Sequence, residues 1–235
     1  MIARDSSVLA VVPARGGSKG IPRKNLTPLA GHPLLWWTVE SVRAAEQPIR
    51  LVVSTDDAEI ADLALGWGSE VAARPPELAA DESPTELAIE HILAHVPGAL
   101  QARILMLLQP TSPIRLPGSL DRAIEWFAKG TSDSLVGVVS EPPFLWRGPE
   151  ESPTPLYDPP HRKRRQDMDA KDLAYRETGS LYLTTVEAFR ASGNRISGRV
   201  GLYVMSATEG VDIDTLDDLA LAETLLRGSL QRRLK

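Results

Sequence analysis

Positive charge is concentrated in a glycine-containing stretch near the start of the chain. Its four cations fall within ten positions, and no carboxylate separates them: Arg15, Lys19, Arg23 and Lys24. Gly16 and Gly17 allow backbone N–H groups to approach an anion closely, and Lys and Arg bring charge to phosphate oxygens. The stretch therefore predicts a phosphate-binding loop. The alternative is a solvated surface loop whose charges have no ligand.

The spacing of the glycines excludes two well-known phosphate loops. A P-loop needs the pattern G-x-x-x-x-G-K-[ST], which the segment from Gly16 to Gly20 does not supply. The dinucleotide-binding pattern G-x-G-x-x-G is also absent from the sequence. The predicted loop is therefore a Gly-Gly turn with interleaved cations, and it belongs to neither class.

Two aspartates, Asp212 and Asp214, stand two residues apart late in the chain. Residues two apart in an extended segment share a face, so both carboxylates can reach one cation. Mg²⁺ prefers one or two carboxylates together with phosphate oxygens and water. The pair therefore predicts a magnesium site. The alternative is structural, because Asp214 is also placed to cap a helix, with Asp217 in its first turn.

The elements that must position these residues alternate along the chain. Apolar runs predict strands at 8–13, 51–54, 103–108, 134–139, 179–184 and 202–205. Periodicity and start signals predict helices at 33–45, 57–65, 84–96, 117–129, 186–192 and 215–226. The expected caps are Asp56, Ser83 and Asp214.

This alternation predicts a fold class. Strands joined by helices form a mainly parallel sheet that is covered on both faces, which is a Rossmann-like three-layer α/β/α fold. Ligands of such sheets bind beyond the carboxyl ends of the strands. The cationic loop follows the first predicted strand, so we expect it at that edge of the sheet.

The composition changes at Glu141, where prolines become frequent. They stand at 142, 143, 149, 153, 155, 159 and 160, and a basic run follows at 163–165. This pattern is typical of neither a helix nor an ordinary strand. We expect an arm over 141–178, inserted into a single domain at 1–235, that contacts a second subunit of a homodimer. The alternative is a mobile loop.

Overall composition narrows the class of protein. The chain has 235 residues and a net charge of −5, and it lacks cysteine. A nucleic-acid-binding protein would usually carry a basic excess, and no apolar run approaches the roughly 18 residues of a membrane span. Absence of cysteine is compatible with a reducing compartment. We expect a soluble cytoplasmic protein that binds neither nucleic acid nor membrane.

Four ordered motifs resemble the acylneuraminate cytidylyltransferases, including their pseudaminic and legionaminic acid relatives. The motifs are ARGGSKGIPRKN at 14–25, LLQPTSPIR at 107–115, YRETGSLYL at 175–183 and VDIDTLDDLALAE at 211–223. The resemblance covers essentially the whole chain. It implies a nucleotidyltransferase fold and Mg²⁺-dependent transfer of CMP from CTP to an α-keto acid sugar, with release of pyrophosphate.

The resemblance also implies roles for single residues. On the nucleotide side, Arg15, Lys19 and Lys24 would grip the triphosphate above the backbone of Ala14, Gly16 and Gly17, and Asp212 and Asp214 would hold the metal ion. The segment 74–83 would wrap the base through Arg74, Ala80, Asp81 and Ser83. A purine nucleotide remains an alternative, because a guanylyl-transferring branch resembles this segment.

On the acceptor side, the resemblance implies contacts from Gln109, Thr111, Ser112, Arg165, Gln166 and Tyr182. A Gln amide both donates and accepts hydrogen bonds, which suits a sugar hydroxyl or carboxylate, and a bidentate Arg suits a carboxylate. The alternatives are a plain turn at Gln109 and an ordinary half-buried strand residue at Tyr182.

The acceptor side also departs from the family pattern. Residues 192–197 are polar where sialic acid enzymes place aromatic side chains, and 144–147 lacks the usual Lys. The expected acceptor is a sialic acid-like nonulosonate, and another acidic molecule such as a phosphonate is an alternative. Two rival functions also remain: nucleotidyl transfer to a neutral sugar 1-phosphate, and a non-enzymatic nucleotide-binding or scaffolding protein.

Overall fold

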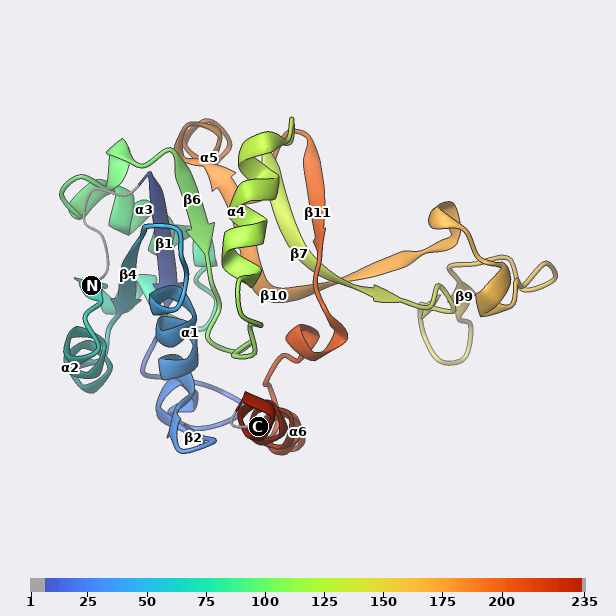
Figure 1. Ribbon diagram of the computed structural model, residues 1–235, viewed down its shortest axis with the longest axis horizontal. Helices are drawn as coiled ribbons and strands as arrows, with labels where there is room; N and C mark the ends of the chain where they lie inside the picture. The colour runs from blue at the N-terminus through green and yellow to red at the C-terminus, as the bar shows by residue number, and fades with distance from the viewer. Residues whose placement is uncertain (1–6, 234–235) are drawn as a thin grey trace.

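The computed structural model describes residues 7–233, which form a seven-stranded sheet with helices on both faces (Figure 1). The strand order is β11-β7-β10-β6-β1-β4-β5. These strands are β1 (Val8–Pro13), β4 (Ile49–Thr55), β5 (Glu70–Ala73), β6 (Ile104–Leu107), β7 (Ser134–Glu141), β10 (Ala174–Thr185) and β11 (Val200–Val204). The helices are α1 (Leu34–Arg43), α2 (Ala58–Gly66), α3 (Thr85–His95), α4 (Ser119–Lys129), α5 (Val186–Ser192) and α6 (Leu216–Arg233).

The sheet is mainly parallel, which confirms the predicted fold class. Parallel pairs join β11 to β7 and run from β6 through β1 and β4 to β5. Strand β10 is the exception, because it runs antiparallel to both β6 and β7. The sequence pattern missed both this reversal and the short strand β5.

Two apolar layers fix the sheet between its helices. One layer packs α1, α2 and α4 against one face, and the other packs α3 and α5 against the opposite face. Strand β1 lies inside the sheet, between β6 and β4, and its residues Val8 to Val12 are at most 3 % exposed. Because β1 is fixed on both sides and by both neighbouring strands, the loop that follows it starts from a rigid position.

Helix α6 is attached to the carboxyl edge of the sheet rather than to either face. Its Ala222 and Leu226 pack with Leu29 and Ile213 in a third apolar cluster. Leu29 belongs to a small hairpin of β2 (Pro28–Leu29) and β3 (His32–Pro33), which follows the cationic loop. This cluster brings the segments 21–34 and 213–226 together at one edge.

All three expected helix caps were placed on the wrong residue or have another role. The Asp57 carboxylate, not that of Asp56, accepts from the Ile60 amide at the start of α2. Thr215 caps α6 by accepting from the Asp218 amide, and Asp214 is bound elsewhere. The Ser83 hydroxyl donates to the Glu77 carbonyl instead of capping α3. Adjacent candidates cannot be separated by type alone, because the cap depends on backbone direction.

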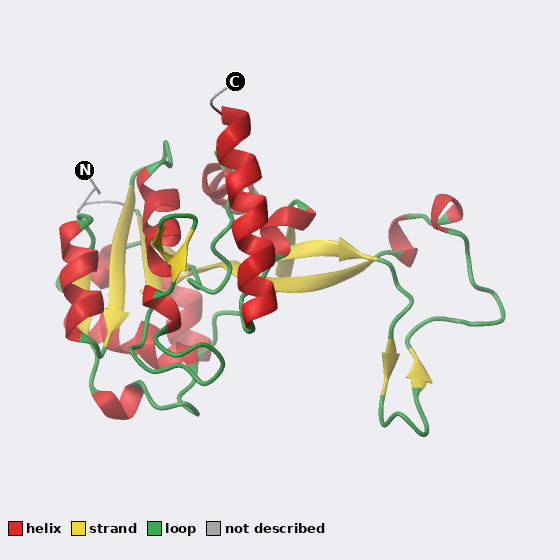
Figure 2. Cartoon of the chain, turned by 90° about the horizontal axis from the view of Figure 1, so that it is seen from below, coloured by secondary structure: helices red, strands yellow, loops and turns green. Residues whose placement is uncertain are grey.

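The proline-rich segment forms an arm that projects from the body (Figures 1 and 2). Strands β7 and β10 extend into it as a pair that reaches Glu141 and Ala174. Beyond them lie a hairpin of β8 (Trp146–Arg147) and β9 (Thr154–Pro155) and two short turns, η4 (Arg165–Asp167) and η5 (Ala170–Asp172). Strand β10 begins at Ala174, five residues before the predicted strand 179–184, so the end of the predicted arm belongs to this strand. None of the helices in residues 7–233 combines the length and apolar character that crossing a lipid bilayer requires.

Candidate active site

A cavity of about 370 Å³ opens at the carboxyl edge of the sheet. It lies between the loop after β1, the segment after β5 and the turn after β6, as expected for a parallel sheet. The predicted site residues that line it are Arg15, Lys19, Lys24, Arg74, Ala80, Asp81, Ser83, Gln109, Thr111 and Asp214. Segments up to 199 positions apart in sequence thus share one space, from Arg15 to Asp214.

The loop after β1 is held by polar contacts rather than by an apolar core. Asn25 donates its side-chain amide to the Arg15 carbonyl at 2.9 Å, and the Gly16 amide donates to Asp56 at 3.0 Å. A Cβ on Gly16 would lie 2.6 Å from the Asp57 carboxylate, so close approach requires glycine there. The Gly16 amide is thus occupied by a carboxylate, and neither Gly16 nor Gly17 is among the residues lining the cavity.

One carboxylate lies between the two outermost cations of the cavity. Asp81 accepts from Arg15 at 2.5 Å and pairs with Lys19 at 3.2 Å. The hydrogen bond from Lys19, supported by Arg15, lowers the pKa of Asp81. Asp81 therefore neutralises the two cations that a phosphate group would meet, and we expect an anion to displace it from them, in place of the base contact that the resemblance implies for Asp81.

Replacing Asp81 with Asn should raise nucleotide affinity a few-fold, because the amide frees Arg15 and Lys19 for phosphate oxygens. The measurement is a calorimetric titration with CTP at two salt concentrations, and the gain should shrink as salt screens the exposed charges. The matched control is Glu82→Gln, which removes a neighbouring exposed charge. A lower affinity for D81N than for E82Q would contradict the displacement of Asp81.

Lys24 links the loop to the acidic segment. Its side chain is buried, and Nζ donates to the Ile213 carbonyl at 2.7 Å and to the Asp214 carboxylate at 2.8 Å. Gly20 approaches the same segment so closely that a Cβ would overlap the Asp214 carbonyl oxygen. Lys24 thus aims one carboxylate at the cavity, a role that the sequence did not predict. Arg23 points elsewhere and pairs with Asp57 and Glu59 beside α2.

Asp212 is tied to the turn after β6. The Ser112 hydroxyl, which is buried, lies 3.1 Å from the Asp212 carboxylate and 2.6 Å from the Thr178 carbonyl. The Ile213 amide donates to the Thr111 carbonyl at 2.8 Å. These bonds fix the segment carrying the two aspartates against the residues predicted to meet an acceptor.

The donor set fits a cation that is shared with phosphate. Within residues 7–233, no cluster of three or more His, Asp or Glu side chains could enclose a metal ion. Mg²⁺ does not need such a cage, since it is commonly held by one or two carboxylates plus phosphate oxygens and water. Asp212 and Asp214 therefore suit a metal ion that arrives with a nucleotide.

The predicted acceptor residues fall into three places. Gln109 lines the cavity, and its side-chain oxygen would lie 2.7 Å from a Cβ on Gly179, which has a φ of +70°. Tyr182 is buried in the layer beneath α3, and its hydroxyl donates to Glu177 at 3.0 Å. Burial, more than the nearby Glu177, raises the pKa of Tyr182 to about 12. Arg165 and Gln166 are exposed on the arm, and neither is among the residues lining the cavity.

Comparison with known proteins connects this geometry to a family. The family model described as Cytidylyltransferase matches residues 9–225. The chain belongs to the cytidylyltransferase family. The match includes the cationic loop, the turn after β6 and the aspartate pair, so all walls of the cavity lie within it.

Curated relatives support the same family. N-acylneuraminate cytidylyltransferase A of Danio rerio is 34 % identical over 92 % of this chain, and CMP-N,N'-diacetyllegionaminic acid synthase of Legionella pneumophila is 34 % identical over 93 %. The chain spans 50 % of the length of the first relative and 96 % of the second.

Solved structures share the fold. A CMP:2-keto-3-deoxy-manno-octonic acid synthetase complexed with CTP has a TM-score of 0.69 at 16 % identity, with 95 % of this chain and all of the other covered. A 2-C-methyl-D-erythritol 4-phosphate cytidylyltransferase of Thermus thermophilus has a TM-score of 0.60 at 19 % identity, and the match covers 93 % of this chain and 98 % of the other.

Sequence reasoning missed several residues that line the cavity or support its walls. Asn25 could have been found, because it ends the first motif and an amide can hold a loop backbone. Thr85 lines the cavity at the start of α3, where its role as a helix-start residue hid it. Asp56 was assigned to a helix cap, although its carboxylate serves the loop.

Proposed function

We propose that this chain is an Mg²⁺-dependent cytidylyltransferase that transfers CMP from CTP to a hydroxyl of a sialic acid-like nonulosonate. The observation that carries the proposal is the shared cavity: the cations of the β1 loop, the base-side segment, Gln109 and Asp214 all border one space. Relatives named for sialic, legionaminic and pseudaminic acid point to an acidic nine-carbon sugar.

For this reaction the protein must align the two reactants and stabilise the negative charge of the phosphates. An acceptor oxygen attacks the α-phosphorus in line, and pyrophosphate leaves with its bond electrons. Arg15 and Lys19 stand where a departing pyrophosphate would need cations, once Asp81 has yielded. Bound Mg²⁺ would neutralise phosphate charge, held by Asp212 and Asp214.

Recognition of the two substrates is assigned to opposite walls. Ala80 and Ser83 border the base side together with Arg74, which is buried. Gln109, with Thr111 and Ser112 behind it, borders the acceptor side. We assign Arg165, Gln166 and Tyr182 to the acceptor as well, with the arm residues delivered by a second copy.

The deciding experiment measures pyrophosphate release from CTP over a panel of acceptors. We expect release with N-acetylneuraminate or a diacetylated nonulosonate, and CMP-sugar as the second product. If pyrophosphate is released only with a phosphonate, or only with a sugar phosphate, the assigned acceptor would change and the assignment of CTP as the nucleotide would stay. Binding of CTP without release in the presence of any acceptor would point to a nucleotide-binding protein.

We further propose that two copies pair through the arm. The arm exposes large apolar side chains, with Leu145, Trp146 and Leu156 each about half exposed in the single chain. Three exposed aliphatic residues also line one side of edge strand β11: Val200, Leu202 and Val204. Exposed apolar side chains that gather on one element are typical of protein interfaces.

Mixing two inactive variants tests whether Arg165 acts across the pair. Arg165→Ala removes the arm residue, and Asp212→Asn removes a proposed metal ligand. If Arg165 acts on the partner's cavity, co-expression of the two variants should recover activity that neither has alone. The control mixes each variant with an inactive Arg165→Ala/Asp212→Asn double variant. No recovery, with mixed dimers confirmed by tag capture, would assign Arg165 to its own chain or to no role.

A further inference from the structure

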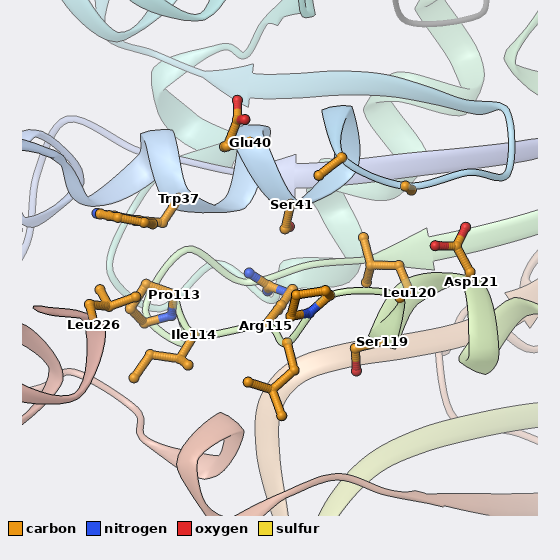
Figure 3. Close-up of a pocket in the computed structure, with 15 residues that line it drawn as sticks. Trp37, Glu40, Ser41, Pro113, Ile114, Arg115, Ser119, Leu120, Asp121 and Leu226 are labelled. Atoms are coloured by element: carbon orange, nitrogen blue, oxygen red, sulfur yellow. The ribbon is translucent and has the colours of Figure 1, made fainter. Parts of the chain in front are cut away.

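Arg115 lies behind the acceptor wall of the cavity and has no part in the chemistry above. It borders a second, smaller cleft of about 160 Å³, between α1 and the segment 113–121, which runs into the start of α4, and Ser41 of α1 lines the same cleft (Figure 3). Arg115 is the last residue of the motif LLQPTSPIR, after the turn that follows β6, and its contacts could not be predicted from this motif. Burial lowers the pKa of Arg115 to about 9, and the Glu209 carboxylate acts in the opposite direction. The group is therefore charged at neutral pH.

The guanidinium of Arg115 bonds to three separate elements. It donates to the Gln109 carbonyl at 3.1 Å, to the Ser180 carbonyl of β10 at 2.7 Å and to the Thr38 hydroxyl of α1 at 3.0 Å. Ser180 follows Gly179, and the side-chain oxygen of Gln109 approaches Gly179 closely. Two of the three acceptors of Arg115 therefore belong to residues at or beside this close approach. A planar fork with fixed donors holds such acceptors at fixed mutual positions, which a single ammonium cannot do.

The next residue extends this network to the acidic segment. The Leu116 amide donates to the buried Glu209 carboxylate at 2.9 Å, and Glu209 also closes the turn η6 (Ala207–Gly210) by accepting from the Ser206 amide. Asp212 follows this turn directly. The half-buried Arg115 guanidinium and the buried Glu209 carboxylate, which carry opposite charges, thus lie behind Gln109 and the segment of the two aspartates.

We propose that Arg115 is a positioning residue that fixes the Gln109 turn and the bend of β10 for the acceptor, while leaving the nucleotide side untouched. This inference rests on the proposed function, since it assigns Gln109 to the acceptor. None of the Arg115 hydrogen bonds reaches the cationic loop or the segment 74–83. The effect of losing Arg115 should therefore be confined to one substrate.

The experiment compares three single variants by steady-state kinetics with both substrates varied. Arg115→Met should lower kcat/KM for the acceptor about 10²-fold, the loss expected when a substrate-positioning group shifts by about 1 Å. The KM for CTP should stay unchanged. Arg115→Lys retains the positive charge but not the planar guanidinium, so its kcat/KM for the acceptor should fall nearly as far as that of Arg115→Met. Thr38→Val is the matched control, because it removes the one acceptor that does not belong to the site.

Guanidinium rescue separates positioning from folding. In Arg115→Ala the cleft of Figure 3 provides a route to the emptied position, so low concentrations of guanidinium chloride should restore part of the acceptor kcat/KM, while sodium chloride should not. The same titration on Thr38→Val should have no effect.

The inference is overturned if R115M keeps its acceptor kcat/KM, or if T38V loses as much as R115M. Failure of the proposed function would look different, since the unchanged chain would then release no pyrophosphate with any acid. In that case crystal structures of R115M and R115K decide: a Gln109–Ser112 turn that stays in place would refute the positioning role, and a displaced turn would support it.

Discussion

Replacing Asp212 with Asn is expected to lower the rate of pyrophosphate release about 10²- to 10³-fold, the loss typical for removing one group that stabilises transition-state charge. Asn has the same shape, and its side-chain oxygen can still accept from the Ser112 hydroxyl, which lies 3.1 Å from the carboxylate in the structure. The fold should therefore persist. What is lost is the negative charge that a hard cation requires of its ligand.

The measurement that checks this expectation is the rate as a function of Mg²⁺ concentration. The half-saturating concentration should rise for D212N, and the thermal midpoint without nucleotide should stay close to that of the unchanged chain. Asp217→Asn is the matched control, because Asp217 is an exposed acid in the first turn of α6. Equal rates for D212N and D217N would remove Asp212 from the metal site.

The second large effect is expected from Gly20→Ala. A methyl group at this position would overlap the backbone carbonyl oxygen of Asp214, and backbone yields less readily than the end of a side chain. The loop must then move away from the acidic segment, which stretches the bonds from Lys24 to Ile213 and Asp214. Overpacking of this kind typically costs about 1–3 kcal/mol.

We expect Gly20→Ala to reduce turnover about 5- to 100-fold, the loss that results if a cost of this size falls on the transition state, and to lower the thermal midpoint by several degrees. Gly17→Ala provides the control for glycine replacement in the same loop, since a Cβ there meets nothing within 4 Å. Its stability without nucleotide should be unchanged. Activity of G20A at the level of the unchanged chain would show that the loop and the acidic segment need not touch.

The parts of the fold with clear local signals could be predicted from sequence. Strand β1 and helix α5 were placed with their observed bounds, because Pro13 and the Ser192–Gly193 pair mark their ends. Strand β5 was missed, since Glu70–Ala73 is only four residues long, begins with a charged residue and contains two alanines. The antiparallel direction of β10 could not be inferred, because direction depends on where the arm returns the chain and not on side-chain type.

For the candidate site, sequence was a good guide to residue types and a poor guide to pairing. The cationic loop is continuous in the chain, so its position after a buried strand was enough to place it. Its partners are remote: Asp81 is 66 positions from Arg15, and Asp214 is 190 from Lys24. Charges that were assigned to a ligand thus turned out to hold each other, which depends on three-dimensional proximity alone.

The way the arm is attached affects how the protein can diverge. Strands β7 and β10 carry the arm on a ladder whose register shifts once, between Glu177 and Tyr182, and whose inner end is fixed by the buried residues Leu135, Val136, Tyr182 and Leu183. Because alternate residues of a strand face opposite sides, loss of one residue within the ladder would turn every inward side chain outward. Insertions or deletions between Glu141 and Ala174, in the distal part of the arm, would leave the register of the two strands unchanged. Homologous chains can therefore vary the distal part of the arm, and with it the pairing surface proposed above, while the interior of the sheet stays as it is.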